Sequence, residues 1–279
     1  MTAIAETTPW LSWSFSPLVL AGATVAIAFF FHGFRRLRRR GRADLAPWSR
    51  AALFVTGVGI TVFALVGPID TVGEEYLQSV HMLQHVLVAD LGIALTLVAV
   101  RGPLAVFFLP RSLLVPLAHT RWLRRALAFV LRPSVSYLVW VGTVVVWHVP
   151  AAYEGALTSP VVHSLEHVSF VVAGLLVWTQ IVDPTGHHRL TVGERAGSVA
   201  LLFWTGQILA YVIAFAAEPL YDTYADQAER LLGLSAITDQ KLSAVVMIVE
   251  QTLTLGVAFV LLYRQASARR APGSPEHVG

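Results

Sequence analysis

Long apolar stretches, separated by short polar ones, dominate this sequence. Within them the apolar residues follow one another without the alternation that a membrane β-barrel would show. A helix needs about 20 predominantly apolar residues to cross the hydrocarbon layer of a bilayer. The pattern therefore predicts an all-α, polytopic membrane protein with seven transmembrane helices, at about 16–34, 51–67, 76–100, 134–149, 161–182, 196–217 and 242–263.

The polar segments divide the rest of the chain. We expect a short extracytoplasmic segment at 1–15, a single seven-helix domain at 16–263 and a disordered cytoplasmic tail at 264–279. Residues 101–132 carry six arginines among apolar pieces that are too short, and too often broken by proline, to span a membrane. Such pieces are typical of helices that lie along the membrane surface.

The composition agrees with a membrane protein and narrows its chemistry. Of 279 residues, 56% are hydrophobic and only 13% are charged, whereas soluble domains carry roughly 25% charged residues. The chain contains no cysteine. Thiolate metal ligands, disulfides and dithiol redox chemistry are therefore excluded.

The positive charges are strongly asymmetric. If the N-terminus lies outside, the segments after the first, third, fifth and seventh helices are cytoplasmic, and they hold 18 of the 20 Lys and Arg residues. Only Arg230 and Lys241 then remain outside. Because cytoplasmic segments are enriched in positive charge, we expect an outside N-terminus and a cytoplasmic C-terminus. The basic runs flank helices and face the lipid bilayer, so we do not expect nucleic acid as a partner.

Five histidines gather at one predicted depth. His81 and His85 stand four residues apart at the start of the third helix, and His163 and His167 repeat this spacing in the fifth. Residues four apart share one face of a helix. His148 ends the fourth helix. With a rise of about 1.5 Å per residue, all five lie within roughly 10 Å of depth near the outer surface.

This arrangement favours a metal site. Histidine is rare in membrane helices and usually functional there, and imidazole nitrogen suits copper, zinc, iron or nickel. Neighbouring groups could orient the rings from behind or add a soft thioether ligand. These are Asp70, Glu154, Glu166, Asp239, Met82 and Met247, although packing in the core is the simpler interpretation of the two methionines. The opposing interpretation of the histidines is that they only bond to backbone carbonyls or to one another.

Two carboxyl groups lie deeper in the predicted membrane, Asp90 in the third helix and Glu250 in the seventh. An isolated charge there is costly, so both should face the interior of the bundle and be protonated or paired. Gln207 and Tyr211, one turn apart in the sixth helix, are possible partners. The four groups could form a path for protons or cations, or serve only the structure.

Several segments resemble one known family, the CtaG-like cytochrome c oxidase assembly factors of seven-helix type. The similar segments, in the order of that family, are Gly67-Pro68-Ile69-Asp70, His81-Met82-Leu83-Gln84-His85, Trp147 to Leu157, His163-Ser164-Leu165-Glu166-His167, Pro219-Leu220-Tyr221 and Asp239-Gln240-Lys241-Leu242. The resemblance covers about 15–263. It implies a multi-pass protein of the bacterial plasma membrane that binds copper. It also implies as partner a cytochrome c oxidase subunit or a copper donor protein.

The chain departs from the family pattern in the deeper layer. In the third helix, members of the family usually continue the histidine motif into Ala-Pro-Pro, whereas this chain has Gly92-Ile93-Ala94 there. In the seventh helix, family members often have a Trp and a Pro after the position of Met247, whereas this chain has Ile248 to Gln251. The outer histidines are retained. The departures therefore concern the region of Asp90 and Glu250, while the metal-site hypothesis rests on residues that match.

Three functions remain open on sequence alone. The first is a copper-binding assembly factor that holds its ion at the five histidines. The second is a redox protein with haem between histidines of facing helices, and the third is a metal or proton transporter that uses Asp90 and Glu250. We expect no enzyme, because the chain offers no activated nucleophile and no acid–base pair for turnover.

Topology can be tested directly. A reporter that works only in the cytoplasm should be active when it is fused after Arg264, because the asymmetry of Lys and Arg places this end of the chain inside. A reporter that works only outside should be inactive at the same position. The opposite result would contradict both the topology and the side assigned to the histidines.

Overall fold

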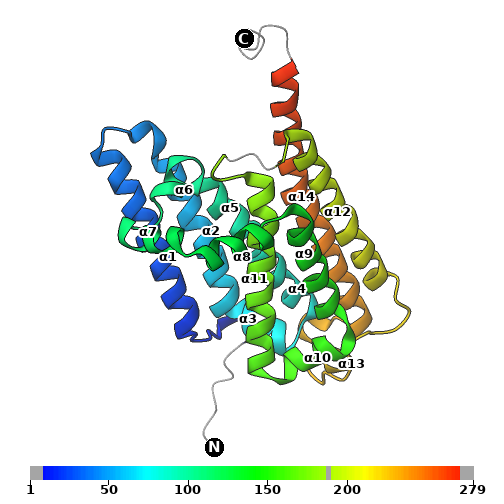
Figure 1. Cartoon of the computed structure of the whole chain (residues 1–279). Coiled ribbons are helices and arrows are strands. Elements are labelled where there is room, and N and C mark those ends of the chain that lie inside the picture. Colours follow the sequence, from blue (N-terminus) through cyan, green and yellow to red (C-terminus); the bar gives the residue numbers. More distant parts are fainter. Residues whose placement is uncertain (1–8, 187–189, 271–279) are drawn as a thin grey trace, which may run out of the picture.

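The structure, a computed structural model, describes residues 9–186 and 190–270. Over these residues the chain forms a bundle of long helices that shorter helices connect (Figure 1). The long helices are α1 (Pro17–Arg39), α2 (Trp48–Val66), α9 (Pro133–His148), α11 (Pro160–Val182), α12 (Val192–Ala214) and α14 (Ala236–Arg270). A further long helix consists of α4 (Gln78–Val86), a π-helical turn η3 (Leu87–Leu91) and α5 (Gly92–Val100), which follow one another without a break.

The predicted all-α membrane architecture is confirmed. Six helices of the described chain are long and apolar enough to cross a membrane. The seventh predicted span, α9, has only 16 residues. It reaches the required length only together with α8 (Arg121–Val130), from which it is bent by 69°. The two helices therefore count as one broken span or as a re-entrant element.

Short helices fill the segments between the spans. They are η1 (Pro9–Leu11), η2 (Ala43–Leu45), α3 (Pro68–Glu75), α6 (Pro103–Phe107), α7 (Arg111–His119), α10 (Pro150–Thr158), α13 (Asp222–Ala225) and η4 (Leu231–Gly233). In the region 101–132, α6, α7 and α8 have at most 10 residues each, too short to span alone, as the sequence predicts. The predicted tail differs in its first part, because α14 continues to Arg270. Residues 1–8, 187–189 and 271–279, and with them His187, His188 and His277, lie outside the described residues.

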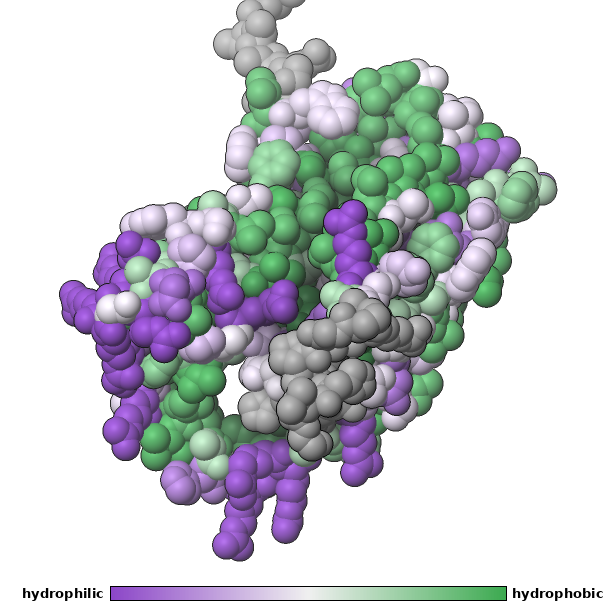
Figure 2. All heavy atoms as spheres, turned by 90° about the horizontal axis from the view of Figure 1, so that it is seen from above, coloured by the Kyte–Doolittle hydropathy of each residue, from purple (hydrophilic) through white to green (hydrophobic). Residues whose placement is uncertain are grey.

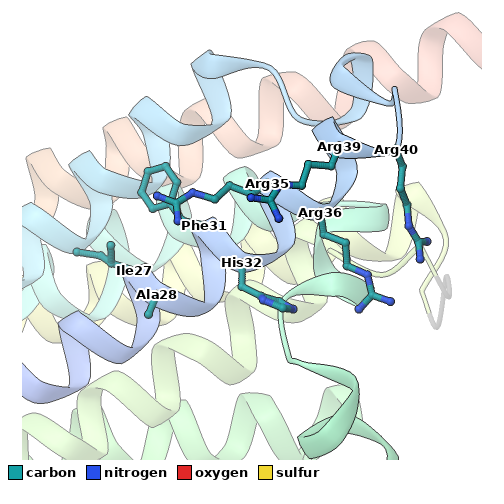
Figure 3. Close-up of a pocket in the computed structure, with 8 residues that line it drawn as sticks. All are labelled: Ile27, Ala28, Phe31, His32, Arg35, Arg36, Arg39 and Arg40. Carbon is teal, nitrogen blue, oxygen red and sulfur yellow. The ribbon is translucent and has the colours of Figure 1, made fainter.

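The two ends of the bundle differ in chemistry. We call the end that carries α3, α10 and α13 the histidine end, and the opposite end, where α1 finishes in a run of arginines, the arginine end (Figure 1). Seen from the arginine end, hydrophilic side chains gather around hydrophobic surface (Figure 2). Arg36 of α1 and Arg40, which directly follows this helix, hold their guanidinium groups 5.0 and 5.2 Å from the centre of the Phe107 ring of α6. Figure 3 shows both arginines at this end of α1.

Glycines let the central helices approach closely. A Cβ atom added to Gly174 of α11 would lie 2.1 Å from the carbonyl oxygen of Ala89 in η3. One added to Gly57 of α2 would lie 2.7 Å from the carbonyl oxygen of Gly92 in α5. The helix formed by α4, η3 and α5 is therefore held between α2 and α11 by backbone contacts, and this fixes the faces that it presents to both.

Substitution of Gly174 tests this packing. Gly174→Ala should destabilise the protein by about 1–3 kcal/mol, because the new methyl group meets backbone that cannot move aside cheaply. The matched control is Gly142→Ala in α9, where an added Cβ meets nothing within 4 Å. There the gain in helix propensity should leave stability unchanged or slightly raised. Thermal unfolding of both variants in the same detergent measures the difference, and equal midpoints would contradict the close packing.

Candidate metal centre

Four imidazole rings from two helices face one another at the histidine end. His81 and His85 of α4 have ring centres 4.4 Å apart, and His163 and His167 of α11 have ring centres 4.1 Å apart. Across the two helices, His81 lies 5.6 Å from His163 and His85 lies 5.5 Å from His167. The spacing of four residues thus produces the expected result, because each helix turns both of its histidines toward the other.

Glu166 completes this group of rings. Its side chain is only 1% exposed, and its oxygens lie 3.9 Å from Nε2 of His81, 3.7 Å from Nε2 of His85 and 4.0 Å from Nε2 of His163. Two sets of ligand atoms in the described chain lie within 4.8 Å of one another: those of His81, His163 and His167, and those of His81, His85 and Glu166. The sequence suggested Glu166 as a supporting acceptor, whereas the structure places its carboxylate among the possible ligands.

Hydrogen bonds fix the tautomer of several rings. Nδ1 of His163 lies 2.7 Å from a carboxylate oxygen of Glu74, and Nδ1 of His148 lies 2.7 Å from the carbonyl oxygen of Val144. Both oxygens can only accept a hydrogen bond, so Nδ1 must carry the hydrogen in each ring. Nε2 then keeps its lone pair, which is the form of imidazole that binds a metal.

The same conclusion holds for His81. The hydroxyl group of Tyr224 donates its hydrogen to the carbonyl oxygen of Gly73 at 2.6 Å, so toward His81 it can only accept. Nδ1 of His81 lies 3.1 Å from this hydroxyl and 3.0 Å from that of Tyr153. Burial raises the pKa of both tyrosines well above the usual value, which keeps them neutral. With Nδ1 donating to the hydroxyl oxygen of Tyr224, Nε2 of His81 presents a bare lone pair as well.

Polar atoms without hydrogen-bond partners consequently collect in this buried space. Within the described residues, the atoms that are buried and without a hydrogen-bond partner include Nε2 of His81, His85, His148, His163 and His167 and Oε2 of Glu166. Buried polar atoms are normally paired, so each exception needs an explanation. A metal ion satisfies several such atoms at once, since ligand nitrogens lie about 2 Å from copper or zinc.

His148 holds a more peripheral position than the other four histidines. It ends α9 directly before the turn into α10, and its ring centre lies 6.5 Å from that of Tyr153. It belongs to neither of the two sets of ligand atoms within 4.8 Å. Its unpartnered Nε2 is nevertheless buried. The structure thus brings four predicted histidines into one group and leaves the fifth beside it.

Contacts from distant parts of the chain hold α4 in place beneath α3. Asp239 of α14 accepts hydrogen bonds from the backbone N–H groups of Gln78 and Ser79 at 2.7 and 3.2 Å, which satisfies free donors at the start of α4. Gly73 of α3 packs so closely that an added Cβ would lie 2.9 Å from Cα of His81. The position of His81 is therefore set by α3 and α14 as well as by its own helix.

Three of the carboxylates expected to support the histidines form their described hydrogen bonds with other groups around the site and not with the imidazole rings. Asp70 accepts a hydrogen bond from Nε2 of Gln84 at 2.7 Å, and burial raises the pKa of Asp70. Glu154 accepts from the backbone N–H of Thr223 at 3.1 Å and so ties α10 to α13. Asp239 caps α4, as described above. None of the hydrogen bonds described for these three carboxylates joins an imidazole.

The methionines follow the simpler interpretation. Met82 and Met247 are buried together in an apolar cluster that also contains Ala210, Ile213 and Ala244. Because Met82 lies on the side of α4 that faces α12 and α14, its sulfur belongs to that core.

Three partners of the rings were not anticipated. Glu74, Tyr153 and Tyr224 all contact Nδ1 atoms of the site. Each of them lies far along the chain from the histidine that it contacts, so no local sequence pattern reveals the contact. The remaining signal was weak: polar or aromatic residues in short segments that connect the histidine-bearing helices at the same end.

The hydrogen bonds described for the deeper polar groups do not join them into one path. Asp90 accepts a hydrogen bond from Nε1 of Trp178 at 3.0 Å, and Glu250 bonds within its own helix to Thr254. Gln207 lies 3.3 Å from Gln251 rather than from either carboxyl group. Tyr211 is 45% exposed on the outer surface of α12, so its predicted role as a partner inside the bundle is wrong.

Fold and site together define a polytopic helical membrane protein with a buried cluster of histidines and one glutamate at one end of its bundle. A family model described as cytochrome c oxidase caa3 assembly factor (Caa3_CtaG) matches residues 28–269. The chain belongs to this family, which confirms the resemblance found in its motifs, and it is a multi-pass protein of the bacterial plasma membrane. No curated protein and no solved structure matches the chain.

Substitution of Glu166 tests whether this residue is a metal ligand or only stabilises the fold. Glu166→Gln should raise the thermal midpoint of the metal-free protein, because the amide brings N–H donors to the unpartnered Nε2 atoms of His81 and His85. The same change should weaken binding of a copper ion, since a carboxylate oxygen is lost from the group. Lower stability combined with unchanged copper affinity would show that Glu166 serves only the fold.

Proposed function

We propose that this protein binds a copper ion at the histidine end and supplies it to cytochrome c oxidase during assembly. The family establishes the role in oxidase assembly. The observation that supports copper binding is the buried convergence of imidazole Nε2 atoms and Glu166 without donors. The ion is cargo in this proposal, held until a partner takes it.

The donor set suits this cargo. Imidazole nitrogen is a good ligand for copper in both common oxidation states, and the cysteine-free chain offers no thiolate to hold the ion permanently. The inner ligands in this proposal are His81, His85, His163, His167 and Glu166. His148 lies beside them and could bind the ion during loading or release. Zinc fits the same nitrogens, so metal analysis rather than geometry must decide between the two.

The site belongs at the outer face of the plasma membrane in this proposal. The distribution of Lys and Arg supports a cytoplasmic arginine end and, with it, a histidine end outside. A copper donor protein would load the site there, and an oxidase subunit would receive the ion. The family description is that of an assembly factor, which suggests a non-catalytic role.

The two alternatives fit the site less well. A haem needs a flat slot between two axial histidines, whereas here His163, His85 and Glu166 all surround Nε2 of His81. A transporter needs polar groups that lead onward from the site. Phe170 instead packs its ring against His85 at 4.5 Å between centres, on the side of α11 that continues toward Trp178 and Asp90.

Metal analysis with ligand variants tests the proposal. Protein purified without chelators should contain copper, and His81→Ala should lower the affinity more than His148→Ala, because His81 belongs to both close ligand sets and His148 to neither. His81 is also already oriented by two tyrosines, so little ordering remains to oppose binding. Competition for Cu(I) against a chromophoric chelator measures both constants.

His119→Ala provides the control, since His119 lies at the end of α7, away from the site, and should leave the affinity unchanged. A strong Soret band in the purified protein would favour haem and contradict the proposal. So would copper binding that survives the simultaneous loss of His81 and His163.

A further inference from the structure

A cavity of about 550 Å³ reaches the candidate metal site from the side. It lies between α1, α2 and α11, near the histidine end. Its lining includes Ser14 and Gly22 from the start of the chain, Asp70 and Glu74 of α3, and His163 and His167 of α11. The cavity is therefore in contact with the α11 half of the site.

The opposite side of the site is closed. Tyr153, Tyr221 and Tyr224 form a cluster over His81 in which each residue is at most 3% exposed. Tyr153 and Tyr221 stack with ring centres 3.9 Å apart, and the hydroxyl group of Tyr221 reaches the backbone of His148. His81 itself is 0% exposed. An ion that arrived through α10 and α13 would have to separate this aromatic cover.

The lateral cavity has mainly apolar walls, and the carboxyl groups that a cation requires lie at the end nearest the histidines. Glu74 is 35% exposed at the side chain and holds His163 at 2.7 Å, so it connects the solvent-accessible surface to the first imidazole of the site. Asp70 adds a second carboxyl group to the same lining. Carboxylates in a cleft with low-dielectric walls attract cations and raise their local concentration.

We infer that the copper ion enters and leaves through this cavity between α1 and α11, past Glu74 to His163 and His167, and not through the tyrosine cover. This inference rests on the proposed function and adds the route of the ion. It makes α1 a wall of the route, since its start faces the histidines across the cavity. A protein that donates or receives the ion must therefore reach the histidine end at the gap between α1 and α11.

The cysteine-free chain allows a direct test of the route. Gly22→Cys places one thiol on the cavity wall, and Gly142→Cys places one on α9, outside the cavity lining. At both positions an added Cβ meets nothing within 4 Å, so both variants should fold normally. Each full-length protein is purified, alkylated with a bulky maleimide and then mixed with Cu(I) bound to a chromophoric chelator.

The adduct at Gly22 should slow copper uptake by about tenfold or more while the final occupancy stays the same, because it obstructs the path and not the ligands. The adduct at Gly142 should load at the rate of the unmodified protein. Uptake at the unmodified rate in the Gly22 adduct would overturn the route while leaving the proposed function intact. If the unmodified protein takes up no copper that depends on its histidines, the proposed function fails and the route fails with it.

Removal of the charge of Glu74 provides a second, independent test of the route. Glu74→Gln keeps an oxygen that can accept from Nδ1 of His163 but removes the charge at the mouth of the cavity. It should slow uptake at low ionic strength, and added salt should reduce the difference. Glu75→Gln is the matched control, because Glu75 is the next residue of α3, exposed and absent from the cavity lining. Equal slowing by both changes would contradict a path that passes Glu74.

Discussion

A group of lone pairs without donors, held together inside an apolar bundle, is the constraint on which the histidine end depends. Each buried polar atom without a partner costs roughly 1–3 kcal/mol, and six such atoms belong to the five histidines and Glu166. Such an arrangement persists only if its helices cannot separate. Asp239 at the start of α4, Gly73 over His81 and Gly174 against η3 supply that restraint. A bound cation would relieve the cost that these contacts now oppose.

Apolar runs made the spans predictable, because a membrane helix is defined by its own composition. The predicted ends of α2, α9 and α11 agree with the structure to within a few residues. Helices α3, α10 and α13 lack such a run, since each has fewer than ten residues and carries charged or tyrosine side chains. Contacts made only in the folded protein stabilise them, such as the hydrogen bond from Thr223 to Glu154.

The site was partly predictable for a similar reason. Spacing within one helix and depth along it are local properties, and they sufficed to select the five histidines. Glu166 stands three residues after His163 and so shares its face, which was a usable signal for a ligand position. The contacts of His81 with Tyr153 and Tyr224 span 72 and 143 residues of sequence, and no local pattern reveals such pairs.

The π-helical turn η3 separates the two histidines of α4 from the polar contact of Asp90 on the same long helix. In an uninterrupted α-helix, Asp90 would point about 140° away from His85. The N–H group of Gly92 instead bonds to the carbonyl oxygen of Leu87, five residues earlier, which turns Asp90 toward α11 and Trp178. The ring of Phe170 in α11 packs on the imidazole of His85. An apolar ring in contact with the site favours a protein that holds its ion at one end over one that conducts it across.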